Sequence, residues 1–162
     1  MKIGVLSDTH VPTRARSVPA PVLQAFQGVD AILHAGDLAD ESVLRQLERL
    51  APVYAVRGNV DPPNLWHRLP ARRLVTLGGV RIGLVHGDGT SGSTVERARR
   101  AFRADGVDCI VFGHSHEPYC ERRDGVLLFN PGSPTDRRRQ PQHSYGFLTI
   151  TDGRVEGRIL YF

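Results

Sequence analysis

The chain has 162 residues, of which 40% are hydrophobic and 23% charged, and this composition excludes an intrinsically disordered or fibrous protein. No apolar run approaches the roughly 20 residues of a membrane-spanning helix, and the first residues lack the long apolar stretch of a signal peptide. We therefore expect a cytoplasmic protein with no membrane partner.

The formal net charge is +4, from 21 basic and 17 acidic residues. All basic residues except Lys2 are arginines, and several stand in pairs or in the run Arg137-Arg138-Arg139. Arginine forks bind phosphates well, so a nucleic acid is a conceivable partner. Aromatic residues make up only 7% of the chain, which leaves few platforms for base stacking, and nucleic acid is therefore not favoured.

Five short apolar runs each end in a cluster of Gly, Asp, Asn or His. The runs are residues 2–6, 31–33, 53–56, 81–85 and 109–112. Such segments are typical of buried strands that open into loops. Helices are expected between them, at residues 20–27, 40–50 and 93–104. Strands that alternate with helices indicate an α/β fold with a substantially parallel sheet.

Later in the chain the pattern changes to antiparallel strands. Gly78-Gly79 predicts a hairpin between residues 74–77 and 80–85. Further strands are expected at residues 119–122, 126–130, 146–151 and 155–162, with a polar loop at residues 135–144. We expect a single domain over residues 1–162, with two sheets packed face to face, the first mostly parallel and the second mixed.

The polar clusters at the strand ends contain typical metal ligands. Ligands bind at the carboxyl ends of strands in open α/β sheets, so the clusters are expected to converge. The candidates are Asp8, His10, Asp37, Asn59, His86, His114 and His116. Mixed oxygen and imidazole donors suit Mn, Fe, Zn, Ni or Co, and seven groups exceed the roughly four to six ligands of one ion. Two divalent metal ions that share a carboxylate are therefore expected.

The Asp-X-His and His-X-His spacings also predict which side chains point the same way. Alternate residues at the end of an extended strand point to the same side. We therefore expect Asp8 and His10 to meet one ion, and His114 and His116 to point into the site together.

The order of five short motifs resembles that of the calcineurin-like metallophosphoesterases. The motifs are Asp8-Thr9-His10, Gly36-Asp37, Gly58-Asn59, His86-Gly87 and Gly113-His114-Ser115-His116. The resemblance reaches at least Gly132, and Asn130-Pro131-Gly132-Ser133 is similar to the small phosphodiesterase branch of bacteria and archaea. It implies a four-layer α/β/β/α sandwich of two mixed β-sheets flanked by helices. It also implies a dinuclear metal centre, in enzymes whose activity is usually assayed with manganese.

The resemblance further implies how the ligands divide between the two ions. One ion is expected on Asp8, His10, Asp37 and His116, and the other on Asp37 as the bridge with Asn59, His86 and His114.

Two neighbouring cations lower the pKa of a bridging water and clamp the oxygens of a phosphoester. The expected function is therefore a metal-dependent phosphoesterase, foremost a phosphodiesterase, in which a metal-bridging hydroxide attacks the phosphoester. No side chain is expected as nucleophile. Asn59 and Arg137 are the candidates for contact with the substrate phosphate.

One position departs from the family pattern, in which many members carry a histidine directly after Gly-Asn that is thought to protonate the leaving group. Here the residue is Val60, so the general acid is unassigned. A nuclease or nucleotide phosphohydrolase is one alternative function, and a non-catalytic interaction scaffold of the same fold is another. The complete set of ligand residues argues against the scaffold, and a homo-oligomer is compatible with the sequence.

Overall fold

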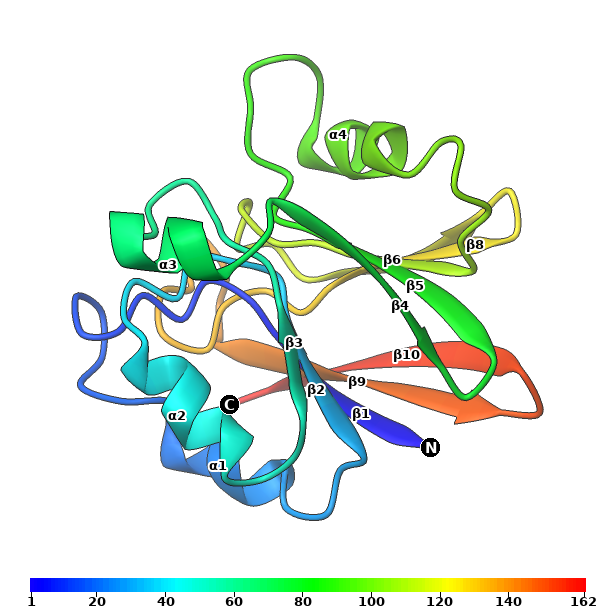
Figure 1. The fold of residues 1–162 in the computed structure, drawn as a ribbon. Coiled ribbons are helices and arrows are strands. Elements are labelled where there is room, and N and C mark those ends of the chain that lie inside the picture. Colours follow the sequence, from blue (N-terminus) through cyan, green and yellow to red (C-terminus); the bar gives the residue numbers. More distant parts are fainter.

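The computed structural model describes residues 1–162, whose strands form two five-stranded sheets (Figure 1). The first sheet has the order β10-β9-β1-β2-β3 and consists of β1 (Lys2–Leu6), β2 (Ala31–His34), β3 (Val53–Ala55), β9 (Ser144–Thr151) and β10 (Arg154–Tyr161). The second has the order β4-β5-β6-β8-β7 and consists of β4 (Arg72–Leu77), β5 (Val80–Val85), β6 (Cys109–Val111), β7 (Tyr119–Arg123) and β8 (Val126–Asn130).

Both sheets are mixed. In the first, β2 pairs parallel with β1 and β3, and β9 pairs antiparallel with β1 and β10. In the second, β6 pairs parallel with β5 and β8, and the edge strands β4 and β7 are antiparallel. The expectation of a mostly parallel first sheet is wrong, because the β9–β10 hairpin returns to β1. Hydrophobic alternation shows that a strand is half-buried, but it does not specify which sheet the strand joins.

Helices cover both outer faces. The helices are α1 (Ala20–Ala25), α2 (Ser42–Glu48), α3 (Pro63–Arg68) and α4 (Thr94–Ala101). Helices α1 and α2 lie on the first sheet and α4 on the second, so the layers run helix, sheet, sheet, helix (Figure 1). Helix α3 was not expected, because its six residues bury only Leu65 and show no helical period. None of the helices has the length and apolar character needed to cross a membrane.

Apolar side chains fill the three spaces between these layers. Ile3 of β1 packs between the sheets with Ile82 of β5. Phe26 packs in the layer under α1 and α2, and Phe102 in the layer under α4, and both are almost completely buried. Full burial of a phenylalanine side chain contributes about 1.5–3 kcal/mol. These layers fix the strands whose carboxyl ends carry the candidate ligands.

Candidate metal centre

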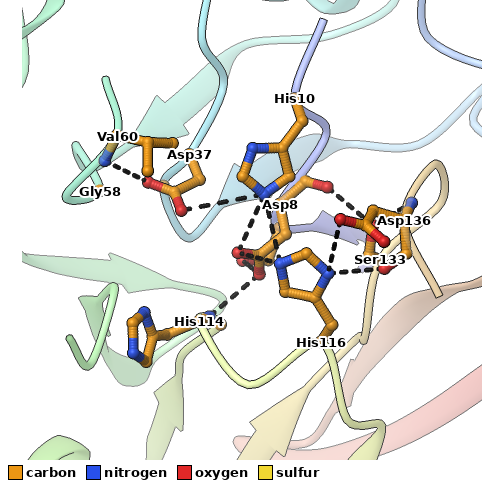
Figure 2. Close-up of polar contacts among 12 residues, drawn as sticks. Asp8, His10, Asp37, Gly58, Val60, His114, His116, Ser133 and Asp136 are labelled. Carbon is orange, nitrogen blue, oxygen red and sulfur yellow. Dashed lines mark hydrogen bonds and ion pairs between the residues drawn. The ribbon is translucent and has the colours of Figure 1, made fainter. Parts of the chain in front are cut away.

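Donor atoms of five of the seven candidate ligands form two overlapping clusters. The ligand atoms of Asp8, His10 and His116 all lie within 4.8 Å of one another, and so do those of Asp8, Asp37 and His86. Oδ1 of Asp8 is 3.2 Å from Nε2 of His116 and 3.8 Å from Nε2 of His10. Figure 2 shows the Asp8 carboxylate in contact with both rings. The loops after β1, β2, β5 and β6 therefore converge at one point.

Asp8 belongs to both clusters, and Asp37 of the second cluster also approaches the first. Oδ2 of Asp37 lies 3.1 Å from Nε2 of His86 and 3.9 Å from Nε2 of His10, while its Oδ1 accepts the N–H of Val60 at 3.0 Å (Figure 2). One oxygen of Asp37 thus faces a histidine of each cluster, and its role as a bridge between two ions stays a prediction.

Asn59 and His114 lie beside the second cluster. Nδ1 of His114 is 3.2 Å from Oδ1 of Asn59, and the His114 ring packs edge-on to that of His86 with centroids 5.2 Å apart. The structure brings His114 next to His86, although no ligand atom of His114 belongs to either cluster. The roles of Asn59 and His114 as ligands stay predictions.

Left-handed turns, and not strand alternation, aim the side chains. β1 ends at Leu6 and β6 at Val111, and the four candidate ligands beyond them have positive φ angles. The values are +54° at Asp8, +42° at His10, +66° at His114 and +59° at His116. Asp8 and His10 do lie together as expected, but left-handed turns bring them there, and strand alternation is the wrong reason. Non-glycine residues rarely adopt this backbone because of steric crowding, and surrounding contacts must hold it.

The loop after β8 holds the turn that carries Asp8. The Ser133 hydroxyl donates to the carbonyl oxygen of Asp8 at 2.7 Å, and the Thr135 hydroxyl donates to that of Thr9 at 2.7 Å. Ser133 Oγ also accepts the N–H of Asp136 at 2.9 Å (Figure 2). The sequence predicted only a polar loop over residues 135–144, because hydroxyl groups give no signal of their backbone partners.

Asp61 joins the loops after β2 and β3. Its carboxylate accepts the N–H groups of Gly58 at 2.7 Å, Ala39 at 2.7 Å and Asp37 at 3.1 Å. Burial raises the pKa of Asp61 despite these bonds. Because Gly58 has no side chain, its loop can lie directly against Asp37: a Cβ atom at this position would be 2.0 Å from Oδ1 of Asp37.

The tautomers of two histidines suit metal coordination. Nδ1 of His86 lies 2.7 Å from the carbonyl oxygen of Ala35, and Nδ1 of His116 lies 2.5 Å from that of Asp136. A carbonyl oxygen only accepts, so in each neutral ring Nδ1 carries the proton and Nε2 presents a lone pair. Metal-binding histidines are typically held by such a bond on the other ring nitrogen.

Two buried atoms in the centre have no hydrogen-bond partner: Oδ1 of Asp8 and Nε2 of His86. An unpartnered buried polar group costs about 1–3 kcal/mol. Both atoms face the clusters, where carboxylate oxygens and imidazole lone pairs converge. A divalent cation would satisfy all of these donors at once, so the residues fit a metal site.

The same convergence shifts the pKa values of the metal-free protein. Burial raises the pKa of Asp8, but the imidazole rings of His10 and His116 beside its carboxylate and the charge of His86 outweigh it and hold the pKa well below its usual range. Burial lowers the pKa of His86, yet Asp37 and Asp8 raise it to about 9 overall. The carboxylates that raise this pKa would equally attract a cation, so metal binding is expected to release a proton from His86.

His34 lies under the centre without belonging to it. Its Nδ1 accepts the N–H of Gly36 at 3.2 Å, so Nε2 carries the proton and donates to Thr9 Oγ1 at 3.1 Å. Burial lowers the pKa of His34 to about 3. The neutral ring therefore supports the turns on either side of it, next to Asp8 and Asp37.

Arg137, the predicted phosphate contact, donates to the carbonyl oxygen of Gln140 at 2.7 Å. Its neighbour Arg138 instead donates to the carbonyl oxygen of His114 at 3.3 Å. Contact between Arg137 and substrate stays a prediction. Arg138 was not singled out, because a run of three arginines does not show which of them faces the site.

Comparison with known proteins assigns the family. The calcineurin-like phosphoesterase superfamily domain matches residues 1–153. The chain belongs to this superfamily. This calcineurin-like phosphoesterase is 42% identical over 135 residues to a probable metallophosphoesterase of Methanothermobacter thermautotrophicus, a match that covers 83% of the chain and 78% of the relative. It is 38% identical over 162 residues to a probable metallophosphoesterase of Methanocaldococcus jannaschii. This match covers 99% of the chain and 81% of the relative.

Solved structures agree with this assignment. Wild-type Vps29 of Entamoeba histolytica, complexed with zinc, has a TM-score of 0.79 at 26% identity, with 99% of both chains covered. Vps29 of Chaetomium thermophilum has a TM-score of 0.82 at 20% identity over 99% and 96% of the two chains, a likeness of fold alone. The predicted family and the sandwich of two mixed sheets are confirmed. Membership implies a metal-dependent phosphoester hydrolase.

Proposed function

We propose that this chain is a phosphodiesterase with a dinuclear metal centre formed by Asp8, His10, Asp37, Asn59, His86, His114 and His116. The proposal rests on the two buried atoms without a partner, Asp8 Oδ1 and His86 Nε2, because Asp8 belongs to both donor clusters and His86 to the second. Two clusters that share a residue favour two ions over one.

The ligand chemistry fits manganese, which is the first ion to test. Imidazole and carboxylate donors suit Mn²⁺ as well as Zn²⁺ or Fe²⁺, and neither cysteine of the chain belongs to the clusters. Zinc is the ion bound by the Vps29 of Entamoeba histolytica, so zinc is the natural comparison in a metal test.

When bound, the two ions supply a water-derived nucleophile near neutral pH and offset the charge of the phosphoester oxygens. The side chains hold the arrangement. Ala35 and Asp136 orient the rings of His86 and His116, and Asp61 fixes the loop of Asp37 relative to that of Asn59.

A diester suits the surroundings better than a monoester. Arg138 is the only arginine whose guanidinium group hydrogen-bonds to a candidate ligand, at the carbonyl oxygen of His114, so little positive charge besides the ions is available for the second negative charge of a monoester. Val60, which follows Asn59, offers no proton to a leaving group. A diester with an acidic leaving alcohol needs no such proton.

The test compares hydrolysis of an aryl phosphodiester with that of the matching aryl monoester by protein reloaded with Mn²⁺ or Zn²⁺ after chelation. We expect two bound equivalents, metal-dependent hydrolysis and a higher kcat/KM for the diester. Asp37→Ala is expected to lower kcat at least 10³-fold, because its oxygen faces both clusters. A protein that binds two equivalents and hydrolyses neither ester would instead be a metal-binding scaffold.

A further inference from the structure

We infer that α3 forms a binding site for a planar aromatic ring of the substrate, next to Asn59 and outside the metal centre. The inference rests on the proposed function for the position of the phosphate. The ring site itself is built from residues that are not proposed ligands, apart from Asn59.

A hollow of about 280 Å³ lies beside Asn59 and is lined by Asn59, Asp61, Pro63, Trp66 and His67. Pockets that enclose a whole small molecule measure about 300–1,000 Å³. This hollow therefore has room for one ring system, with the rest of the ligand outside it. Because Asn59 also contacts His114, the hollow opens directly beside the proposed metal centre.

Trp66 presents an indole ring that is 46% exposed and yet held in place. The guanidinium of Arg57 lies 4.4 Å from the ring centroid and donates to the carbonyl oxygens of Trp66 at 3.1 Å and Leu69 at 3.2 Å. Arg57 does not line the hollow, so the part of the ring that faces the hollow is not the part under the guanidinium. A large aromatic side chain that is exposed and already oriented is suited to stacking.

The remaining walls favour an uncharged ring. Both oxygens of Asp61 accept backbone N–H groups, so this carboxylate is satisfied within the protein. Pro63 and His67 add a pyrrolidine and an imidazole ring. A sugar or a charged group would find few polar partners here, whereas a planar aromatic ring would lie against apolar surface.

The path from the metal centre to the hollow is also uncharged. The N–H of Val60 donates to Oδ1 of Asp37, and the Val60 side chain is 50% exposed between Asn59 and Asp61. Helix α3 lies at the same end of the sandwich as the loops after β1 and β2 (Figure 1). A phosphodiester whose phosphorus lies at the metal centre would place one ester substituent over Val60 and its ring against Trp66.

Binding can be measured without turnover, because Trp66 is the one tryptophan of the chain. Manganese-loaded protein is titrated with adenosine 5′-monophosphate, with phenyl phosphate and with ribose 5-phosphate, which carries the phosphate but no aromatic ring. We expect saturable quenching of tryptophan fluorescence by at least one aromatic phosphate and none by ribose 5-phosphate. The stronger aromatic quencher distinguishes a nucleobase from a simple aryl group. Absence of quenching by both, or equal quenching by ribose 5-phosphate, overturns the inference.

Substitution adds a second readout. Trp66→Ala is expected to raise the KM for an aromatic diester about 5- to 100-fold, the range typical of one stacked base, with kcat and metal content unchanged. Trp66→Phe should keep most of the affinity.

Tyr161→Ala is the matched control, because Tyr161 is 52% exposed and ends β10, at the edge of the first sheet opposite β3. Equal KM values for folded Trp66→Ala and Tyr161→Ala contradict the ring site. A wild-type protein that hydrolyses no diester contradicts the proposed function, and the quenching result still decides the ring site.

Discussion

The carbonyl oxygen of Asp136 accepts the Nδ1 proton of His116 at 2.5 Å, and this bond turns the lone pair of Nε2 toward Oδ1 of Asp8. Ala35 holds His86 in the same way. A backbone atom fixes the tautomer in both cases, so substitution of the neighbouring side chain leaves it in place, whereas movement of the loop changes it.

His116 and His114 are expected to serve different ions. His116→Ala should weaken the ion at Asp8 and His10, and His114→Ala the ion at His86, each by at least about 10²-fold in Kd, because each removes one proposed ligand of one ion: His116 belongs to the first cluster, and His114 lies beside His86 of the second. Metal analysis after dialysis measures both losses, with His143→Ala as the control. Two equivalents bound as tightly as in wild type by both variants would mean that these histidines are structural.

Asp61→Asn is expected to lower the free energy of unfolding by about 2–4 kcal/mol. The amide group keeps one acceptor oxygen but turns an NH₂ group toward backbone N–H donors that the carboxylate now satisfies. Urea denaturation measures the loss, and weaker metal binding should accompany it because Asp37 shifts. Asp88→Asn, at an exposed residue, should change neither quantity. A stable Asp61→Asn with normal metal affinity would remove Asp61 from its positioning role.

His34 makes stability depend on pH. Its pKa is about 3 in the folded chain and about 6.5 when unfolded, so its contribution is complete above pH 6.5 and is lost as the pH falls toward 3. In urea denaturation of chelator-treated protein, wild type should lose up to about 1.4 kcal/mol per pH unit more than His34→Asn between pH 6 and 4. Parallel pH profiles for the two proteins would show that the ring is protonated or exposed in the folded state.

Val60→His tests the unassigned general acid. Without an acid, rates should fall steeply as the pKa of the leaving alcohol rises, and a histidine beside Asn59 should help alkyl leaving groups more than aryl ones, by about 10²-fold at most. A series of diesters with graded leaving groups measures this slope. A flat series in wild type, with chemistry rate-limiting, would show that another residue already donates the proton.

Much of the fold follows from local sequence patterns. The five runs that end in polar clusters became β1, β2, β3, β5 and β6, and the three predicted helices form with shorter bounds. The position of the β9–β10 hairpin could not be predicted, because its pairing with β1 joins residues that are far apart in the sequence. Helix α3 was missed because its one buried side chain, Leu65, gives no periodic signal.

The candidate ligands were likewise visible as residue types at strand ends, but their supports were not. Ser133 and Thr135 act through hydroxyl bonds to backbone carbonyls, and Asp136 acts through its own backbone. Such contacts depend on a loop folded against another loop. The positive φ angles of Asp8 and His116 were hidden for the same reason: Asp and His adopt the left-handed region more often than most residues, but still too rarely for residue type alone to predict it.

The candidate ligands come from both sheets. Asp8, His10, Asp37 and Asn59 follow strands of the first sheet, whereas His86, His114 and His116 follow strands of the second. Between the sheets lies an apolar layer, whose contacts are not directional and resist sliding only through the fit of the side chains. A metal ion bound by ligands from both sheets would link one sheet to the other at this end of the sandwich. Removal of metal would leave hydrogen bonds such as those from His86 to Ala35 and from Ser133 to Asp8 as the directional contacts between the two sheets at this end.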